Sequence, residues 1–209
     1  MTTAATMTAE RPAYLALREP GWALLSGHGL EIGALHEPAP LPAACTVEYV
    51  DAISREEAAR LFPEIEAERL VEPTHLRDLD RQGLEGLLDD HYDFVVLSHV
   101  IEHVADPIQV LGEVFRVLKP GGRFICLEFS HVDVPILDRL YDFHSFEVIP
   151  RLGQLAAGAA DPYRYLVESI RRFPTQERFA DMIRAAGFER VSYRNLTGGV
   201  AALHSGWRI

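Results

Sequence analysis

The sequence feature that most constrains the fold is an alternation of short apolar runs with helical patterns. Residues 94–98 (FVVLS) are apolar almost throughout, as expected for a strand that is covered on both faces. Asp106 and Pro107 then begin a helix, because an acidic cap followed by proline is a common helix start. Residues 123–129 (RFICLEF) form the next strand. This alternation predicts βαβ units and a parallel sheet.

Further strands are predicted on both sides of this unit. They cover residues 29–33, 46–50, 69–72, 188–196 and 200–204. Two helices show one apolar face each. The helix after Asp106 has its apolar positions at Ile108, Leu111, Phe115 and Leu118. A later helix, which ends at Gly187, has them at Phe179, Met182, Ile183 and Ala186. The prediction is an α/β protein: a Rossmann-like, seven-stranded, mostly parallel sheet with helices on both faces and a terminal antiparallel strand.

Length and composition fit one domain in a chain of 209 residues. We expect residues 1–12 to form a disordered tail and residues 13–209 a single domain. No signal peptide or apolar run of about 18 residues is present, so no membrane span is predicted. Cys45 and Cys126 lie in apolar surroundings, which favours buried thiols in a reducing compartment. The expected location is cytoplasmic.

The net charge of −11 argues against nucleic acid as a partner, because such binding needs a basic surface. The charge is uneven, since residues 136–209 hold ten arginines and eight acidic residues. This basic end allows peripheral contact with anionic lipid, although a solvated surface is the simpler interpretation.

Polar residues follow the predicted strands where a sheet of this kind binds ligands, at the carboxyl ends. They are Glu31, Gly33, Ala34 and His36 after the first strand, Asp51 after the second, Thr74 and His75 after the third, and Ser98 and His99 after the fourth. Sheets that bind S-adenosylmethionine (SAM) typically have three features in this order. A glycine turn comes first, an acid that accepts hydrogen bonds from the ribose hydroxyls comes second, and further polar groups follow. The sequence therefore predicts SAM as the cofactor.

Simpler interpretations exist for single residues of this set. An isolated aspartate such as Asp51 often caps a helix, and a buried acid such as Glu31 must find donors and can brace its turn. His99 and His103 have the spacing of a metal pair on a helix, but no third ligand has suitable spacing. No metal site is predicted.

The second half of the chain resembles the ubiquinone/menaquinone C-methyltransferases, the UbiE family. The resemblance covers roughly residues 113–209 and is carried by residues 116–130 (RVLKPGGRFICLEFS), 141–153 (YDFHSFEVIPRLG), 163–174 (YRYLVESIRRFP) and 195–206 (NLTGGVAALHSG). It implies a class I SAM-dependent methyltransferase that methylates a ring carbon of a lipophilic, prenylated quinol in menaquinone or ubiquinone biosynthesis.

The first half departs from that family and is similar to the type 11 methyltransferases. Residues 31–40 (EIGALHEPAP) replace the family's Asp-x-x-x-Gly-Gly-Thr-Gly loop, and the prolines at 38, 40 and 42 argue against a long helix there. By the resemblance, His36 stands at the loop threonine, Asp51 at the ribose acid, Thr74 and His75 at the adenine contacts, and Ser98 at the serine after the fourth strand. Glu102 and His103 stand where the quinone family has Arg-Asn near the reacting ring.

The preferred catalytic residue is His103, with Glu102 beside it, because a neutral imidazole can act as general base near neutral pH. The alternative is a histidine that only bonds the neighbouring backbone. Tyr141, His144 and Tyr163 lie in the segment that resembles the family's substrate cover, or else they pack helices.

Three functions are therefore compatible with the sequence. The first is a quinol C-methyltransferase, the second a type 11 enzyme for another small molecule, and the third a non-catalytic partner subunit with the same fold. The sequence leaves open the quinol, the length of its prenyl chain, whether the chain is a hybrid of two branches, and whether it forms a homodimer.

Overall fold

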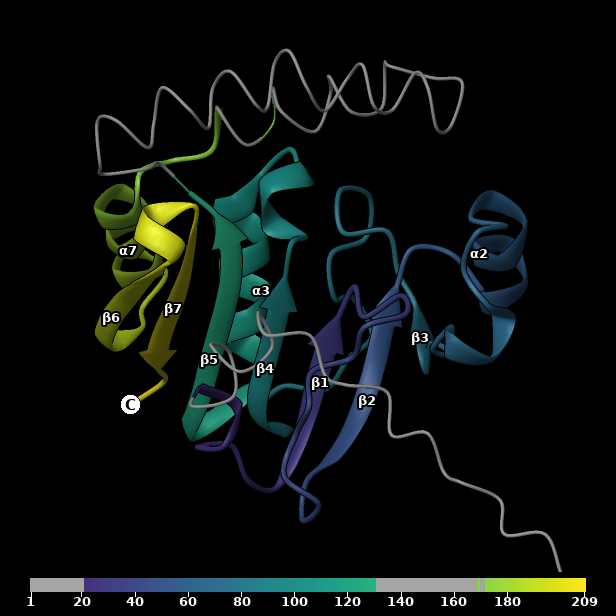
Figure 1. The fold of residues 1–209 in the computed structure, drawn as a ribbon. Helices are drawn as coiled ribbons and strands as arrows, with labels where there is room; N and C mark the ends of the chain where they lie inside the picture. Colours follow the sequence, from purple (N-terminus) through teal and green to yellow (C-terminus); the bar gives the residue numbers. More distant parts are fainter. Residues whose placement is uncertain (1–20, 131–168, 170–171) are drawn as a thin grey trace, which may run out of the picture.

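The computed structural model describes residues 21–130, 169 and 172–209. Within them, one sheet contains β1 (His28–Ile32), β2 (Thr46–Asp51), β3 (His75–Leu76), β4 (Tyr92–Ser98), β5 (Leu118–Phe129), β6 (Glu189–Leu196) and β7 (Ala201–Trp207). Their order across the sheet is β3-β2-β1-β4-β5-β7-β6 (Figure 1). The first five strands are parallel, and β7 runs antiparallel to both β5 and β6. The predicted sheet is confirmed.

The described helices are α2 (Arg55–Leu61), α3 (Pro107–Val117) and α7 (Gln176–Ala185), and 3₁₀ turns occupy Ala67–Arg69, Ile101–His103 and Thr197–Gly199. Asp106 caps α3, because its Oδ1 accepts hydrogen bonds from the N–H groups of Ile108 and Gln109, both at 3.0 Å. The predicted start of this helix is confirmed. Gly187 follows α7 with a positive φ of 104°, as expected for the glycine that ends a helix.

The buried face of α3 differs from the prediction at Ile108, whereas Leu111 and Leu118 are buried and Phe115 packs against the core. It consists of Val110, Leu111, Val114 and Val117. Successive helical residues rotate by about 100°, so these four positions share one stripe whereas Ile108 lies outside it. Ile108 is accordingly 58% exposed.

Two apolar cores lie on opposite faces of the sheet. On one face, α3 and α7 pack against Leu30, Val95, Leu97 and Phe124. On the other, Trp22 and Leu25 pack against Phe94, Val96 and Ile125, with Ala39, Leu41 and Cys45 at the margin. In the described part of the chain, residues 34–45 form no helix, as their prolines predict. Cys126 is buried, but Cys45 is only half-buried.

The third strand and the fifth strand differ from their predicted bounds. The third is His75–Leu76, whereas residues 67–69 form a 3₁₀ turn. The fifth begins at Leu118, which pairs with Tyr92, and residues 119–122 bulge out before Arg123 pairs with Phe94. The predicted tail lies outside the described residues. Among the residues that are described, no helix is long and apolar enough to cross a membrane.

Candidate functional site

A cavity of about 260 Å³ lies at the carboxyl ends of β1, β2 and β4, where the strand order reverses. Its walls come from residues 32–33 and 50–52 at the strand ends, from residues 77–80 after β3, and from His99, Val100, His103 and Val104 after β4. Parallel α/β sheets bind ligands in this position. The cavity is therefore the candidate cofactor site.

Gly33 lies beside this cavity, where the loop after β1 approaches the loop after β4 closely. Its φ is +75°, and its N–H donates to the carbonyl of Val50 at 2.9 Å. A Cβ at this position would lie 2.2 Å from Cγ2 of Val100. Both the backbone conformation and the close approach of Val100 therefore require glycine.

Replacing Gly33 with alanine is expected to lower the free energy of unfolding by about 2–4 kcal/mol, because backbone strain adds to overpacking. The matched control is Gly121→Ala, since Gly121 has a φ of +83° but an added Cβ would meet nothing within 4 Å. The control should lose only about 1 kcal/mol. Urea unfolding measures both variants, and equal losses would contradict the role of Val100.

Asp51 ends β2 and lines the cavity. Its Oδ1 accepts a hydrogen bond from the N–H of Ala52 at 2.7 Å and a longer one from Ile53 at 3.5 Å. Burial raises the pKa of this carboxyl, and the neighbouring backbone N–H groups partly oppose the rise. The structure thus places the predicted ribose-binding acid at the cavity.

The loop after β3 supplies residues that the sequence analysis missed. Asp78 lines the cavity, and its Oδ1 accepts from the N–H groups of Asp80 at 3.0 Å and Arg81 at 3.3 Å. Asp80 in turn accepts from the N–H of Ala105 at 2.7 Å, which ties this loop to the one after β4. Asp78 lies two residues beyond β3, so this acid could have been found only with that strand placed at His75–Leu76.

Thr74 and His75 do not line the cavity, contrary to the prediction. Because β3 begins at His75, both residues lie at the start of the strand rather than after it. Thr74 Oγ1 accepts from the N–H of Tyr49 at 3.1 Å, and His75 Nε2 lies 2.7 Å from Oε2 of Glu48. They stabilise the β2–β3 edge.

Glu31, Ala34 and His36 are close to the cavity in sequence but do not line it. Glu31 is 2% exposed, and its Oε1 accepts from the N–H of Ala39 at 2.8 Å. Burial raises the pKa of Glu31 to about 7. Its contact braces the loop after β1, as the simpler interpretation proposed. Ala34 is buried, and His36 Nε2 lies 4.0 Å from Glu37.

The loop after β4 reaches both the cavity and β5. Ser98 ends the strand and is half-buried but does not line the cavity. His99 does line it, with a φ of +57°, and its N–H donates to the carbonyl of Leu127 at 2.9 Å. The ring of His99 packs on Phe129 with centroids 4.4 Å apart. The carboxyl edge of β5 therefore holds His99 in place.

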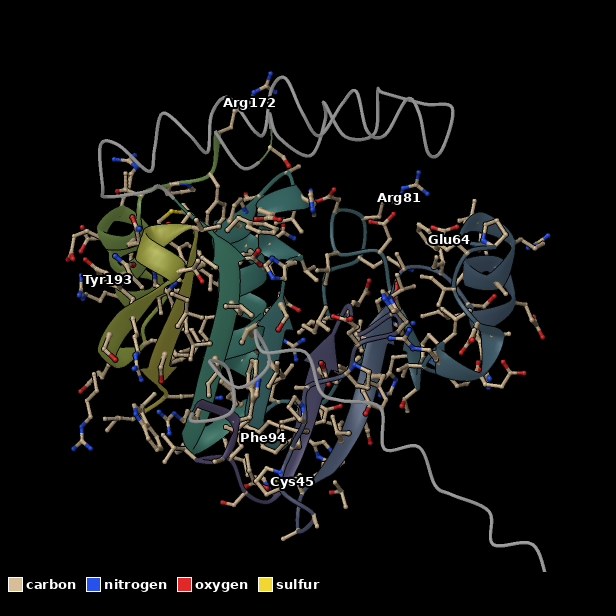
Figure 2. The ribbon with its side chains drawn as sticks, viewed as in Figure 1. Cys45, Glu64, Arg81, Phe94, Arg172 and Tyr193 are labelled. Carbon is tan, nitrogen blue, oxygen red and sulfur yellow. The ribbon has the colours of Figure 1, made fainter. Side chains whose placement is uncertain are left out.

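A second cavity of about 460 Å³ adjoins the first. It is lined by residues 101–105 and by Pro107, Ser169, Arg172, Phe173 and Pro174. Arg172 lies beyond the carboxyl ends of the strands (Figure 2). His103 and Val104 line both cavities, so these two side chains form the boundary between them.

The imidazole of His103 lies near two polar side chains at this boundary. Its Nε2 lies 3.4 Å from Oε1 of Glu102, and its Nδ1 lies 3.4 Å from Oγ of Ser169. Burial lowers the pKa of the imidazole, because an apolar environment disfavours its charged form. His103 is therefore neutral near pH 7 and can accept a proton.

Glu102 and Glu128 form a buried pair of acids behind His103. Glu128 is fully buried, and its Oε1 accepts from the N–H groups of Val100 and Ile101, both at 3.0 Å. Burial raises the pKa of Glu102 to about 7, and burial together with the charge of Glu102 raises the pKa of Glu128 well above its usual range. The two carboxyls are thus expected to share a proton at neutral pH. The sequence analysis missed Glu128, although an acid within an apolar strand was a usable signal.

Tyr141, His144 and Tyr163, the predicted substrate-binding residues, lie outside the described residues.

A family model decides the classification of the chain. The model of the ubiE/COQ5 methyltransferase family matches residues 82–208, more than half of the sequence. The chain belongs to the ubiE/COQ5 methyltransferase family. A second model, the type 11 methyltransferase domain, matches residues 30–126 and so includes the first strands. Both resemblances seen in the sequence are confirmed, and the two models overlap from residue 82 to residue 126.

Curated relatives of this ubiE/COQ5 family member carry the name ubiquinone/menaquinone biosynthesis C-methyltransferase UbiE. Those of Bartonella bacilliformis and Brucella anthropi are 61% and 59% identical to the chain over 121 residues. Each match covers 58% of this chain and 46% of the relative. The chain therefore spans about half the length of the curated relatives it matches.

Solved structures support the fold. A SAM-dependent methyltransferase of Thermotoga maritima, described as a possible histamine N-methyltransferase, has a TM-score of 0.60 at 21% identity and covers 94% of this chain and 89% of its own. A SAM-dependent methyltransferase of Aquifex aeolicus has a TM-score of 0.59 at 13% identity, with coverage of 93% and 89%. The ubiE/COQ5 family member thus has the class I SAM-dependent methyltransferase fold.

Proposed function

We propose that this chain binds SAM in the cavity at the carboxyl ends of β1, β2 and β4 and methylates a ring carbon of a lipophilic, prenylated quinol. The observation that carries the proposal is the pair of adjoining cavities with His103 at their boundary. One cavity suits the methyl donor and the other an acceptor. Membership of the ubiE/COQ5 family supports the reaction class.

The residues of the first cavity fit SAM. Asp51 offers a carboxylate to ribose hydroxyls, and Asp78 offers a second acid on the next loop. Val50, Leu79 and Val100 provide apolar walls for a flat base. These residues replace Thr74 and His75 in the proposed contacts, whereas Glu31 acts by holding the loop after β1 through the N–H of Ala39.

SAM supplies an activated methyl group when it is bound, so the chain needs mainly to align the acceptor and exclude water. His103 is the proposed general base, because its neutral imidazole faces both cavities. The acid pair behind it keeps Glu102 partly protonated near pH 7, which limits the negative charge that would otherwise hold His103 in its protonated form.

A second acceptor class is favoured by one observation. Glu102 and His103 line the acceptor cavity, where the quinone family resemblance expects Arg-Asn. A type 11 activity on another small molecule is therefore the alternative. A panel of demethylmenaquinol, a methoxy-benzoquinol and unrelated phenols separates the two. A lipophilic quinol also implies peripheral membrane contact, which co-sedimentation with vesicles tests, and light scattering tests for a homodimer.

Replacing Asp51 with alanine is expected to weaken binding of S-adenosylhomocysteine by about 1.5–3 kcal/mol, the range for hydrogen bonds to a charged group. Calorimetry measures the affinity, and Asp181→Ala on the exposed surface of α7 is the control. Unchanged affinity in Asp51→Ala would remove this role for Asp51. No binding by the unmodified chain would remove the enzyme proposal and favour a non-catalytic partner subunit.

A further inference from the structure

Three metal-ligating side chains meet at the amino end of the sheet, opposite the edge that holds the cavities. His28 is the first residue of β1, Glu48 lies within β2, and His91 directly precedes β4. β2, β1 and β4 are neighbours in the sheet, in that order. The side chains of His28 and Glu48 are 31% and 28% exposed, so a solvent ion can reach them.

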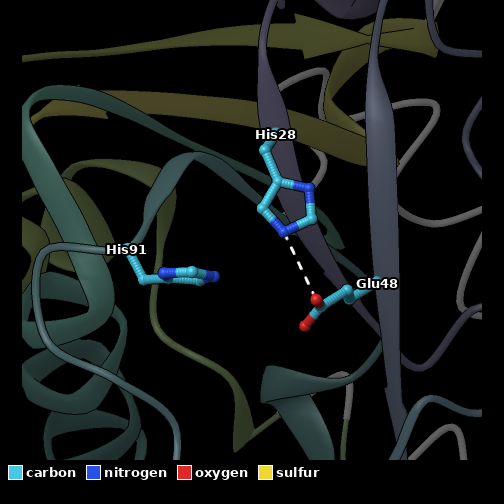
Figure 3. A group of neighbouring side chains, drawn as sticks. All are labelled: His28, Glu48 and His91. Carbon is cyan, nitrogen blue, oxygen red and sulfur yellow. Dashed lines mark ion pairs between the residues drawn. The ribbon is translucent and has the colours of Figure 1, made fainter.

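The three side chains converge on one point. One ligand atom from each of them lies within 4.8 Å of the others. Nε2 of His28 is 3.3 Å from Oε1 of Glu48, and the ring of His91 approaches the same space from the other side (Figure 3). The two imidazole rings are nearly perpendicular, with centroids 5.5 Å apart. In a tetrahedral zinc shell the ligand atoms lie about 3.4 Å apart, so side-chain shifts of about 1 Å complete the site.

Outer contacts already orient the ligand atoms. Nδ1 of His28 lies 2.9 Å from Oγ1 of Thr46, which leaves Nε2 toward the shared space. Oε2 of Glu48 accepts a hydrogen bond from Tyr92 at 2.7 Å and lies 2.7 Å from Nε2 of His75, which leaves Oε1 toward His28. Metal ligands in proteins are typically held by such second contacts. A simple surface ion pair between one histidine and one glutamate would not need these second contacts.

We propose that His28, Glu48 and His91 bind one Zn²⁺ ion, with water in the fourth position, and that the ion links β1, β2 and β4 at their amino ends. Two imidazoles and one carboxylate suit zinc and disfavour Mg²⁺ and Ca²⁺, which take oxygen ligands. No metal was predicted from the sequence because His99 and His103 have no third ligand at suitable spacing. His28, Glu48 and His91 are far apart along the chain, and only the strand pairing brings them together. The site is independent of the proposed methyl transfer.

Zinc chloride titrated into the metal-free full chain should bind with 1:1 stoichiometry by calorimetry, and magnesium chloride should not. Co²⁺ in place of zinc should give the visible absorption of a tetrahedral site. His91→Gln should abolish this binding. Thr46→Val keeps the side-chain shape and should weaken zinc binding by about 10–100-fold, the usual effect of removing a second contact.

Cys45→Ser is the control, because this half-buried thiol lies next to Thr46 in sequence but packs with the core on the other face. It should bind zinc as the unmodified chain does. Far-ultraviolet circular dichroism, which does not depend on the proposed cofactor, checks that each variant is folded. The proposal is overturned if the unmodified chain shows no saturable 1:1 zinc binding, or if folded His91→Gln and Thr46→Val bind zinc normally.

Discussion

Replacing His103 with alanine is expected to lower turnover on a demethylated quinol by about 10²–10⁴-fold, the usual contribution of a general base. The imidazole lines both cavities, and the pKa of the histidine is lowered by burial. The unmodified chain should therefore keep its rate above pH 6.5 and lose it at lower pH, as the base becomes protonated. Affinity for S-adenosylhomocysteine should change far less than turnover.

Val104→Ala is the matched control, because Val104 also lines both cavities but cannot exchange a proton. It should lower turnover much less and leave the pH profile unchanged. Steady-state rates between pH 5 and pH 8 test both variants. Wild-type turnover in His103→Ala would rule out this base. If no quinol is methylated at all, a type 11 activity on another small molecule becomes the better explanation. The resemblance of the second half of the chain to the quinone family then indicates its fold but not its substrate.

The sheet was predictable because its signals are local. An apolar run such as residues 94–98 and a cap such as Asp106 each act within a few residues, and both predictions are confirmed. The third strand was misplaced because it has only two residues, too few for a pattern. Helix α2 was not predicted, since only Ala58 of its seven residues is buried and so no apolar stripe marks it.

The site was less predictable because it depends on pairing between distant strands. Asp51 follows a strand and could be found from its position. Glu128 could not be connected with Glu102 from the sequence, because their contact depends on the register in which Ser98 pairs with Leu127. Asp78 was missed for a related reason, since the error in the third strand shifted the expected contacts to Thr74 and His75.

The buried acid pair leads to a second large effect. Glu102→Gln is expected to be close in stability to the unmodified chain at pH 5 and more stable by about 3 kcal/mol at pH 8. The pKa of Glu102 is about 7 in the folded chain and about 4.5 as an ordinary glutamate. At pH values between these two pKa values, Glu102 keeps its proton in the folded chain but has lost it in the unfolded chain. The free energy of unfolding therefore falls as the pH rises. Glutamine is neutral throughout, so the variant avoids this loss, which at 1.36 kcal/mol per pKa unit gives the expected size.

Comparing the variant with the unmodified chain cancels the titrations of residues that do not contact Glu102. Glu128 is the exception, because its pKa is raised mainly by burial and in part by the charge of Glu102. The pKa of His204 is lowered to about 4 by burial, and that of Glu31 is raised to about 7, but both residues are present in each protein. Urea unfolding at pH 5, 6, 7 and 8 gives the difference. Glu64→Gln is the control, because Glu64 is an exposed acid beyond α2 (Figure 2), and its difference should stay near zero at every pH. If the difference in the free energy of unfolding between Glu102→Gln and the unmodified chain does not change with pH, Glu102 and Glu128 do not share a proton. His103 would then lie next to a charged Glu102.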